Sequence, residues 1–76
     1  MKNANKEEWI EIGAEAKRVR GEIMRLLSKS SGNMTKKTVN DLSLCLKKID
    51  GFRSKAEDEM FRKNRGKDWV NIDIFY

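Results

Sequence analysis

The fold is decided by residues 9–26, which read WIEIGAEAKRVRGEIMRL. The apolar residues of this stretch recur at alternating spacings of three and four, which is the heptad pattern of a coiled-coil seam. Asn5 and Glu8 resemble a capping box just before it. We therefore predict one amphipathic helix over residues 6–28. The seam consists of Trp9, Ile12, Ala16, Val19, Ile23 and Leu26.

A second apolar stripe follows a small, polar turn at residues 29–35. Gly32 suits the end of the first helix, and Thr35 suits the N-cap of another. Helical spacing then predicts a second helix over residues 36–63. Two helices joined by a short turn form an antiparallel hairpin, so we expect a mainly α fold. The second stripe consists of Val39, Leu42, Leu46, Ile49, Ala56 and Met60.

The second helix has one weak point, at Asp50 and Gly51. In one interpretation the helix runs through this point, which gives two arms of similar length that bury each other. In the other, the helix breaks at residues 50–53 and restarts at Ser54, which forms another capping-box signature with Glu57. The matched lengths favour the continuous helix, and the break stays open as the alternative.

The last residues of the chain, 68–76, change period. Apolar side chains alternate with Asn71 and Asp73, which predicts a short β-strand in an extended tail. No other segment has this pattern, and a lone strand cannot satisfy its own backbone groups. The tail therefore pairs with a second copy, adds to a partner's sheet, or lies as a strap across the helices. The candidate partner-binding residues are Trp69, Val70, Ile72, Ile74, Phe75 and Tyr76.

The residue types present exclude most catalytic chemistry. The chain of 76 residues has no histidine and a single cysteine, Cys45, which lies beside an apolar stripe. Histidine-activated nucleophiles, histidine-based zinc sites and disulfide frameworks all need residues that are missing. We therefore expect a protein that is not an enzyme and that uses no metal or cofactor.

A chain that is as charged as it is hydrophobic, at 38% each, has little material for the core of its single domain. Below ~70–80 residues, oligomerisation is a common remedy. We expect a homodimer that forms a four-helix bundle, in which each basic tip lies beside the acidic open end of the other copy. A monomeric hairpin covered by its own tail is the alternative. The apolar edge available to a partner consists of Ile10, Met24, Leu27, Leu44, Cys45 and Phe52.

The net charge of +5 is concentrated at the predicted hairpin tip. Residues 17–37 contain seven basic residues and one acidic residue. Such a cluster suits nucleic acid, because lysine and arginine neutralise phosphates, but no helix-turn-helix, zinc-finger or RNA-binding motif accompanies it. The candidate nucleic-acid-binding residues are Lys17, Arg18, Arg20, Arg25, Lys29, Lys36 and Lys37.

Together these features predict a small helical protein that acts as a self-associating protein-interaction module and offers its C-terminal strand to a protein partner. The alternative is a nucleic-acid-binding or antitoxin-like regulatory protein that uses the basic tip. The single unpaired cysteine, the lack of an apolar run of ~18 residues and the polar start favour a cytoplasmic protein without membrane association.

Overall fold

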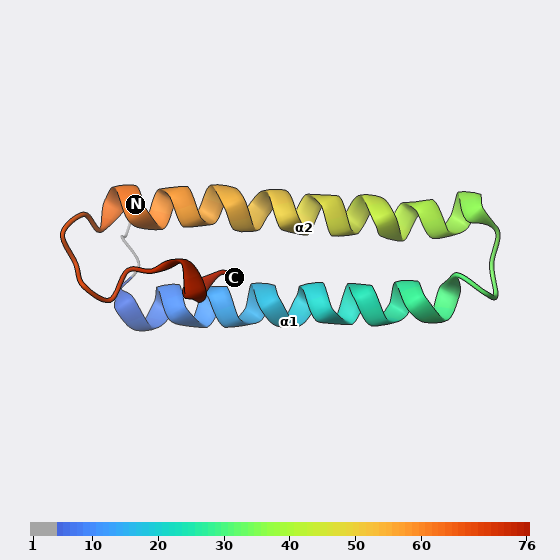
Figure 1. The fold of residues 1–76 in the computed structure, drawn as a ribbon, viewed down its shortest axis with the longest axis horizontal. Coiled ribbons are helices and arrows are strands. Elements are labelled where there is room, and N and C mark those ends of the chain that lie inside the picture. Colours follow the sequence, from blue (N-terminus) through green and yellow to red (C-terminus); the bar gives the residue numbers. More distant parts are fainter. Residues whose placement is uncertain (1–4) are drawn as a thin grey trace.

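The computed structural model of the protein describes residues 5–76. The chain forms two long helices, α1 (Lys6–Ser30) and α2 (Lys36–Lys63), followed by a short 3-10 helix, η1 (Ile72–Ile74). The two long helices pack side by side and run in opposite directions, with the C-terminal segment between them at the end away from the turn (Figure 1). The predicted helical hairpin is thus confirmed.

Both long helices begin at the predicted caps. The Asn5 side chain accepts a hydrogen bond from the Glu8 backbone N–H at 2.8 Å, and the Thr35 hydroxyl accepts one from the Thr38 N–H at 3.3 Å. Each cap satisfies a backbone donor that the first helical turn leaves unpaired. The sequence signal therefore located the two helix starts.

The end of α1 lies two residues beyond the predicted position. Ser31 is the C-cap, in right-handed helical conformation, and its hydroxyl donates to the Leu27 carbonyl oxygen at 2.8 Å. The Asn33 amide donates to the Lys29 carbonyl oxygen at 2.8 Å. These two side chains satisfy carbonyl groups at the helix end, so Gly32 is not needed as a left-handed cap.

α2 continues without a break through Asp50 and Gly51. Gly51 faces open space, with no heavy atom within 4 Å of a Cβ built there. The helix ends at Lys63, and the C-cap residue Asn64 donates from its side-chain amide to the Met60 carbonyl oxygen at 2.9 Å. Gly66 then reverses the chain, with a φ of 82° that glycine adopts readily.

The predicted C-terminal strand is absent: residues 5–76 contain no strand, and the alternating segment holds η1 instead. The Asn71 side chain accepts a hydrogen bond from the Asp73 N–H at 2.8 Å, and the Tyr76 N–H donates to the Ile72 carbonyl oxygen at 3.1 Å. Because no second strand is present, the backbone satisfies its groups locally. We call residues 68–76 the C-terminal strap.

The core lies at the open end of the hairpin, where the strap fills the space between the helices. Phe75 from the strap and Met60 from α2 are fully buried. The Trp9 and Phe75 rings meet edge to face, with centroids 6.3 Å apart and an interplanar angle of 74°. The buried hydrophobic residues are Trp9, Ala16, Ala56, Met60 and Phe75.

The hairpin is long and thin, measuring 48 × 20 × 16 Å. Its radius of gyration is 15.3 Å, against ~11 Å for a compact chain of this length. Its accessible surface is 5937 Å², whereas a typical folded monomer of this mass exposes ~4,800 Å². One chain alone therefore leaves an unusual amount of its surface in water.

Candidate interaction face

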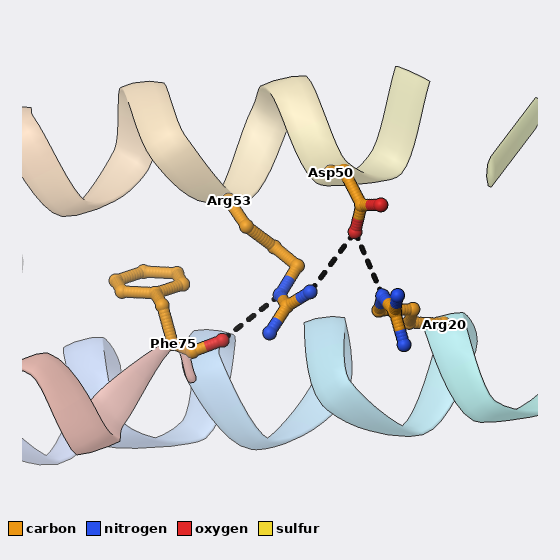
Figure 2. Close-up of polar contacts among 4 residues, drawn as sticks. All are labelled: Arg20, Asp50, Arg53 and Phe75. Carbon is orange, nitrogen blue, oxygen red and sulfur yellow. Dashed lines mark hydrogen bonds and ion pairs between the residues drawn. The ribbon is translucent and has the colours of Figure 1, made fainter. Parts of the chain in front are cut away.

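A cluster of two arginines and one aspartate fastens the strap to the helices (Figure 2). Arg53 donates from Nε to the Phe75 carbonyl oxygen and from Nη1 to Asp50 Oδ1, both at 2.9 Å. Arg20 on α1 donates from Nε to the same Asp50 oxygen at 2.8 Å. The hydrogen bond from Arg20, followed by that from Arg53, holds the pKa of Asp50 below its usual 3.8. One carboxylate thus links α1 and α2, and through Arg53 the strap.

Three further contacts hold the strap on the same side of the hairpin. The Lys17 ammonium group donates to the Asp73 carbonyl oxygen. The Arg53 guanidinium carbon lies 4.3 Å from the centre of the Tyr76 ring, in a cation–π contact. At Gly13, an added Cβ would lie 2.8 Å from the Ile74 carbonyl carbon, so this position admits only glycine while the strap is in place.

Most of the predicted partner-binding residues lie in the strap with their side chains packed against the core. Ile72 and Tyr76 keep 59% and 51% of their surface exposed. The other four are buried or half-buried against the core, so the segment is part of the folded unit and offers no free strand edge. These four are Trp69, Val70, Ile74 and Phe75.

The heptad seam of α1 is divided between the core and the solvent. Trp9 and Ala16 are buried, but Ile12, Val19 and Leu26 are exposed by 38%, 36% and 51%. The three exposed residues lie seven apart and form one row along the helix. A helix of this sequence therefore presents half of its coiled-coil seam to water.

The exposed row lies on the opposite side of the hairpin from the strap. Side chains two positions apart on an α-helix point in directions that differ by about 200° of rotation. Val19 therefore points away from Lys17, whose ammonium group holds the strap. On α2, Phe52 points away from Asp50 for the same reason. The strap covers one broad side of the hairpin at the end away from the turn, and the other broad side is left open along its length (Figure 1).

Two adjoining hollows run along this open side, with volumes of about 450 and 430 Å³. They share Val19, Ile49 and Phe52, so they form one continuous apolar surface between α1 and α2. We call this surface the open face. Its apolar lining consists of Ile12, Ala16, Val19, Ile23, Leu44, Cys45, Ile49 and Phe52.

The two long edges of the open face differ in charge, although Asp58 and Glu59 also stand beside Lys55 on the α2 edge. Glu11 and Glu15 line its larger hollow on the α1 side. Lys48 and Lys55 stand on the α2 side, where they line a neighbouring hollow with Phe52. A polar rim around an apolar centre is the usual composition of a protein–protein interface.

The apolar edge predicted from the sequence does not gather on one surface. Leu44, Cys45 and Phe52 lie on the open face, whereas Leu27 is half-buried. Ile10 and Met24 are exposed, but each lies about 200° from a neighbour in the exposed row, Ile12 or Leu26. The open face therefore has different members from the edge that the sequence predicts.

The predicted basic tip is also divided. Lys17 and Arg20 hold the strap cluster, and Arg18 forms an ion pair with Glu15 one turn away. The remaining four side chains make no contact with any partner among the described residues, so they stay available to an anion at the turn end. These four are Arg25, Lys29, Lys36 and Lys37.

Residues 5–76 contain no cluster of three histidine, cysteine, aspartate or glutamate side chains that would hold a metal ion. Cys45 is exposed on the open face. None of the helices in the described part of the chain combines the length and the apolar character that crossing a bilayer requires.

The two residues that position the strap were not identified from the sequence. Gly13 interrupts the apolar pattern of α1, and Arg53 occupies a heptad position between Ile49 and Ala56 on α2. Both are signals in the sequence: a glycine permits close backbone approach, and an arginine in a seam needs an acceptor. Their common partner, the strap, is visible only in the folded chain.

The chain matches no known family model, no curated protein and no solved structure. Its function is therefore inferred from the geometry of its own residues.

Proposed function

We propose that the protein is a non-enzymatic protein-interaction module that self-associates through the open face. The observation that carries the proposal is the exposed row of Ile12, Val19 and Leu26, of which Ile12 and Val19 line a hollow with Phe52. Apolar residues at heptad spacing pack well against another helix, and here the chain itself supplies none. A second hairpin would convert the two helices into a four-helix bundle.

The size of the open side supports a second copy as the occupant. A stable interface buries ~800 Å² from each partner, and the broad side of the hairpin spans 48 × 20 Å. The accessible surface of 5937 Å² exceeds the ~4,800 Å² of a typical monomer by an area of that order. One face-to-face contact would therefore bring the exposed surface of each chain to an ordinary value.

The charges on the rim also favour self-association. Because one long edge of the open face is acidic and the other basic, two copies of the same face complement each other. An unrelated partner would need an independent match to both edges.

The proposal is tested by sedimentation velocity on the full chain and on two variants. Val19→Lys places a charge in the centre of the open face, between Glu15 and Glu22, so the helix tolerates it while the apolar contact is lost. Met24→Lys is the matched control, because Met24 is 44% exposed and lies away from the open face. We expect the wild type and Met24→Lys to be dimers at micromolar concentration and Val19→Lys to be a monomer with an unchanged helical circular dichroism spectrum. A monomeric wild type would overturn the proposal.

A second candidate function is nucleic-acid binding by the turn end. It is favoured by the four basic side chains there that have no partner among residues 5–76. The test is a binding titration with duplex DNA and with single-stranded RNA at low salt. Phosphate neutralisation predicts an affinity that falls steeply as salt is raised, and that falls again in Lys36→Ala and Lys37→Ala. If neither nucleic acid binds at low salt, this candidate function is ruled out.

A further inference from the structure

The acidic and basic edges of the open face lie on different helices. Glu15 and Glu22 are seven residues apart, so they form one row along the α1 edge. Lys48 and Lys55 are also seven apart and form a row along the α2 edge. This division by helix makes the charge pattern sensitive to how a second copy is oriented.

Two symmetric arrangements bring open face against open face. If the two-fold axis runs along the hairpin, α1 of one copy lies over α2 of the other, and the two turns lie at the same end. If the axis runs across the hairpin, each helix lies over its own counterpart, and the turns lie at opposite ends. Both are closed, two-fold interfaces, so symmetry alone does not choose between them.

The charges on the two edges favour the arrangement in which both turns lie at the same end. Arg20 and Asp50 contact each other and so mark one level of the antiparallel hairpin, which places Glu15, five residues before Arg20, level with Lys55, five residues after Asp50. With the axis along the hairpin, Glu15 therefore meets the partner's Lys55, and Glu22 meets the partner's Lys48. Both contacts join opposite charges, and the symmetry forms each of them twice, whereas Glu11 opposes the partner's Glu59 as a single kind of like-charge contact.

The other arrangement opposes like charges. With the axis across the hairpin, α1 lies over α1 and α2 over α2. The row of Glu15 and Glu22 therefore runs along the same row of the partner, and the row of Lys48 and Lys55 does likewise. Like charges opposed across an interface cost several kcal/mol in general, which disfavours this orientation.

The apolar shapes give the same answer. When the two-fold axis runs along the hairpin, Phe52 of one copy lies over α1 of the other, at an unchanged position along the length of the hairpin. Each Phe52 ring then faces the part of the hollow that Ile12, Ala16 and Val19 line in the partner, across from the partner's own Phe52. A ring that is 47% exposed, set opposite a hollow of about 450 Å³, suits the knobs-into-holes packing that helical bundles use.

We propose, on the basis of the self-association proposed above, that two hairpins form a four-helix bundle with both turns at the same end and α1 packed over α2 of the partner. The two straps then lie on the outer sides of the bundle, at the end away from the turns. The basic side chains of both turns then lie at the same end of the dimer, so this orientation replaces the one expected from the sequence, in which each basic tip lies beside the acidic open end of the other copy. It keeps the pairing of charges along the helices and leaves the basic turns exposed to solvent and salt.

The orientation is tested by a distance measurement between two identical labels. Gly32 lies in the turn with nothing within 4 Å of an added Cβ, so Gly32→Cys in a Cys45→Ser background accepts a spin label. Pulsed electron paramagnetic resonance on the dimer then measures the separation of the two turns. We expect a distance well below half of the 48 Å hairpin length, whereas turns at opposite ends would give a distance near the full length.

Charge exchange supplies an independent test. The pair Lys48→Glu with Lys55→Glu, and the pair Glu15→Lys with Glu22→Lys, should each weaken self-association at least about tenfold. Mixing the two double variants should restore a dimer, because acidic then meets basic at every contact. Circular dichroism of each double variant checks that its helices persist.

The outcomes separate the two proposals. A monomeric wild type overturns both self-association and its orientation. A dimer whose labels lie near 48 Å apart, or whose charge variants fail to rescue each other, overturns the orientation alone. A short distance, together with weakened self-association of each double variant on its own, supports the arrangement with the turns at the same end, since mixing opposes unlike charges in either arrangement.

Discussion

Gly13 is the residue at which α1 and the strap approach most closely. An added Cβ there would lie 2.8 Å from the Ile74 carbonyl carbon and closer still to its oxygen, both backbone atoms that cannot rotate away. Arg53 makes the complementary polar contact from α2, by donating to the Phe75 carbonyl oxygen. These two residues fix where the strap lies, and so which side of the hairpin stays open.

Gly13→Ala should destabilise the protein although alanine is the better helix former. The methyl group forces the strap outward, and we expect a loss of roughly 1–3 kcal/mol in the free energy of unfolding. Gly21→Ala is the matched control, because nothing lies within 4 Å of that position, and it should stabilise α1 by about 1 kcal/mol. Urea unfolding followed by circular dichroism measures both. Equal effects of the two substitutions would contradict this account of Gly13.

Asp50 should make stability depend on pH. Its pKa is lowered in the folded chain by the hydrogen bonds from Arg20 and Arg53. A carboxyl group of this kind stabilises the fold fully above its unfolded pKa and loses that contribution as pH falls through the lower folded-state value. Asp50→Asn should therefore be less stable than the wild type at pH 6, with the difference shrinking below pH of about 4. Thermal unfolding across this range checks it, and a difference that is constant with pH would argue against the ion-pair cluster.

At the scale of elements, the strap is the segment whose secondary structure the apolar pattern of the sequence did not predict correctly. The sequence correctly set residues 68–76 apart from the helices, because the apolar period changes from helical to alternating. It predicted a strand, since alternation is the strand pattern, but strands need a partner edge. The helices offer only side chains, so the segment closes its own hydrogen bonds as η1 and packs Phe75 between them.

Phe75→Ala tests whether the strap belongs to the core. The ring is fully buried against Trp9, and removing a buried phenylalanine ring generally costs 3–5 kcal/mol, roughly the whole stability of a small domain. Ile72→Ala is the control in the same element, because Ile72 is 59% exposed and its loss should cost under about 0.5 kcal/mol. Urea unfolding monitored by tryptophan fluorescence compares them. Similar midpoints for the two variants would mean that the strap is dispensable for folding.

At the scale of the whole molecule, folding and association are expected to be linked. The buried hydrophobic residues all lie at the open end, and the turn half of the hairpin has none. Apolar side chains in that half, such as Leu26 and Leu44, are about half exposed. A single chain thus has one packed end and one end whose helices need a further surface.

The melting temperature should therefore rise with protein concentration. Only native chains dimerise, so dimerisation stabilises the native state over the unfolded chain by mass action. We expect the wild type to melt at higher temperature as concentration increases, and Val19→Lys to melt at a temperature that does not depend on concentration. Differential scanning calorimetry over a wide concentration range makes the comparison. A wild-type melting temperature that stays constant would separate folding from association.

The sequence by itself determined the two helices, their caps at Asn5 and Thr35, and the antiparallel hairpin, because heptad spacing and capping are local properties of the chain. It also predicted that the apolar stripes need a further surface to cover them. Only the tertiary structure decided which half of the α1 seam is covered, since that depends on Gly13 and Arg53 meeting a strap 22 or more residues away. Long-range packing between small, aromatic and charged side chains leaves no periodic trace, so the open face appears only once the chain has folded.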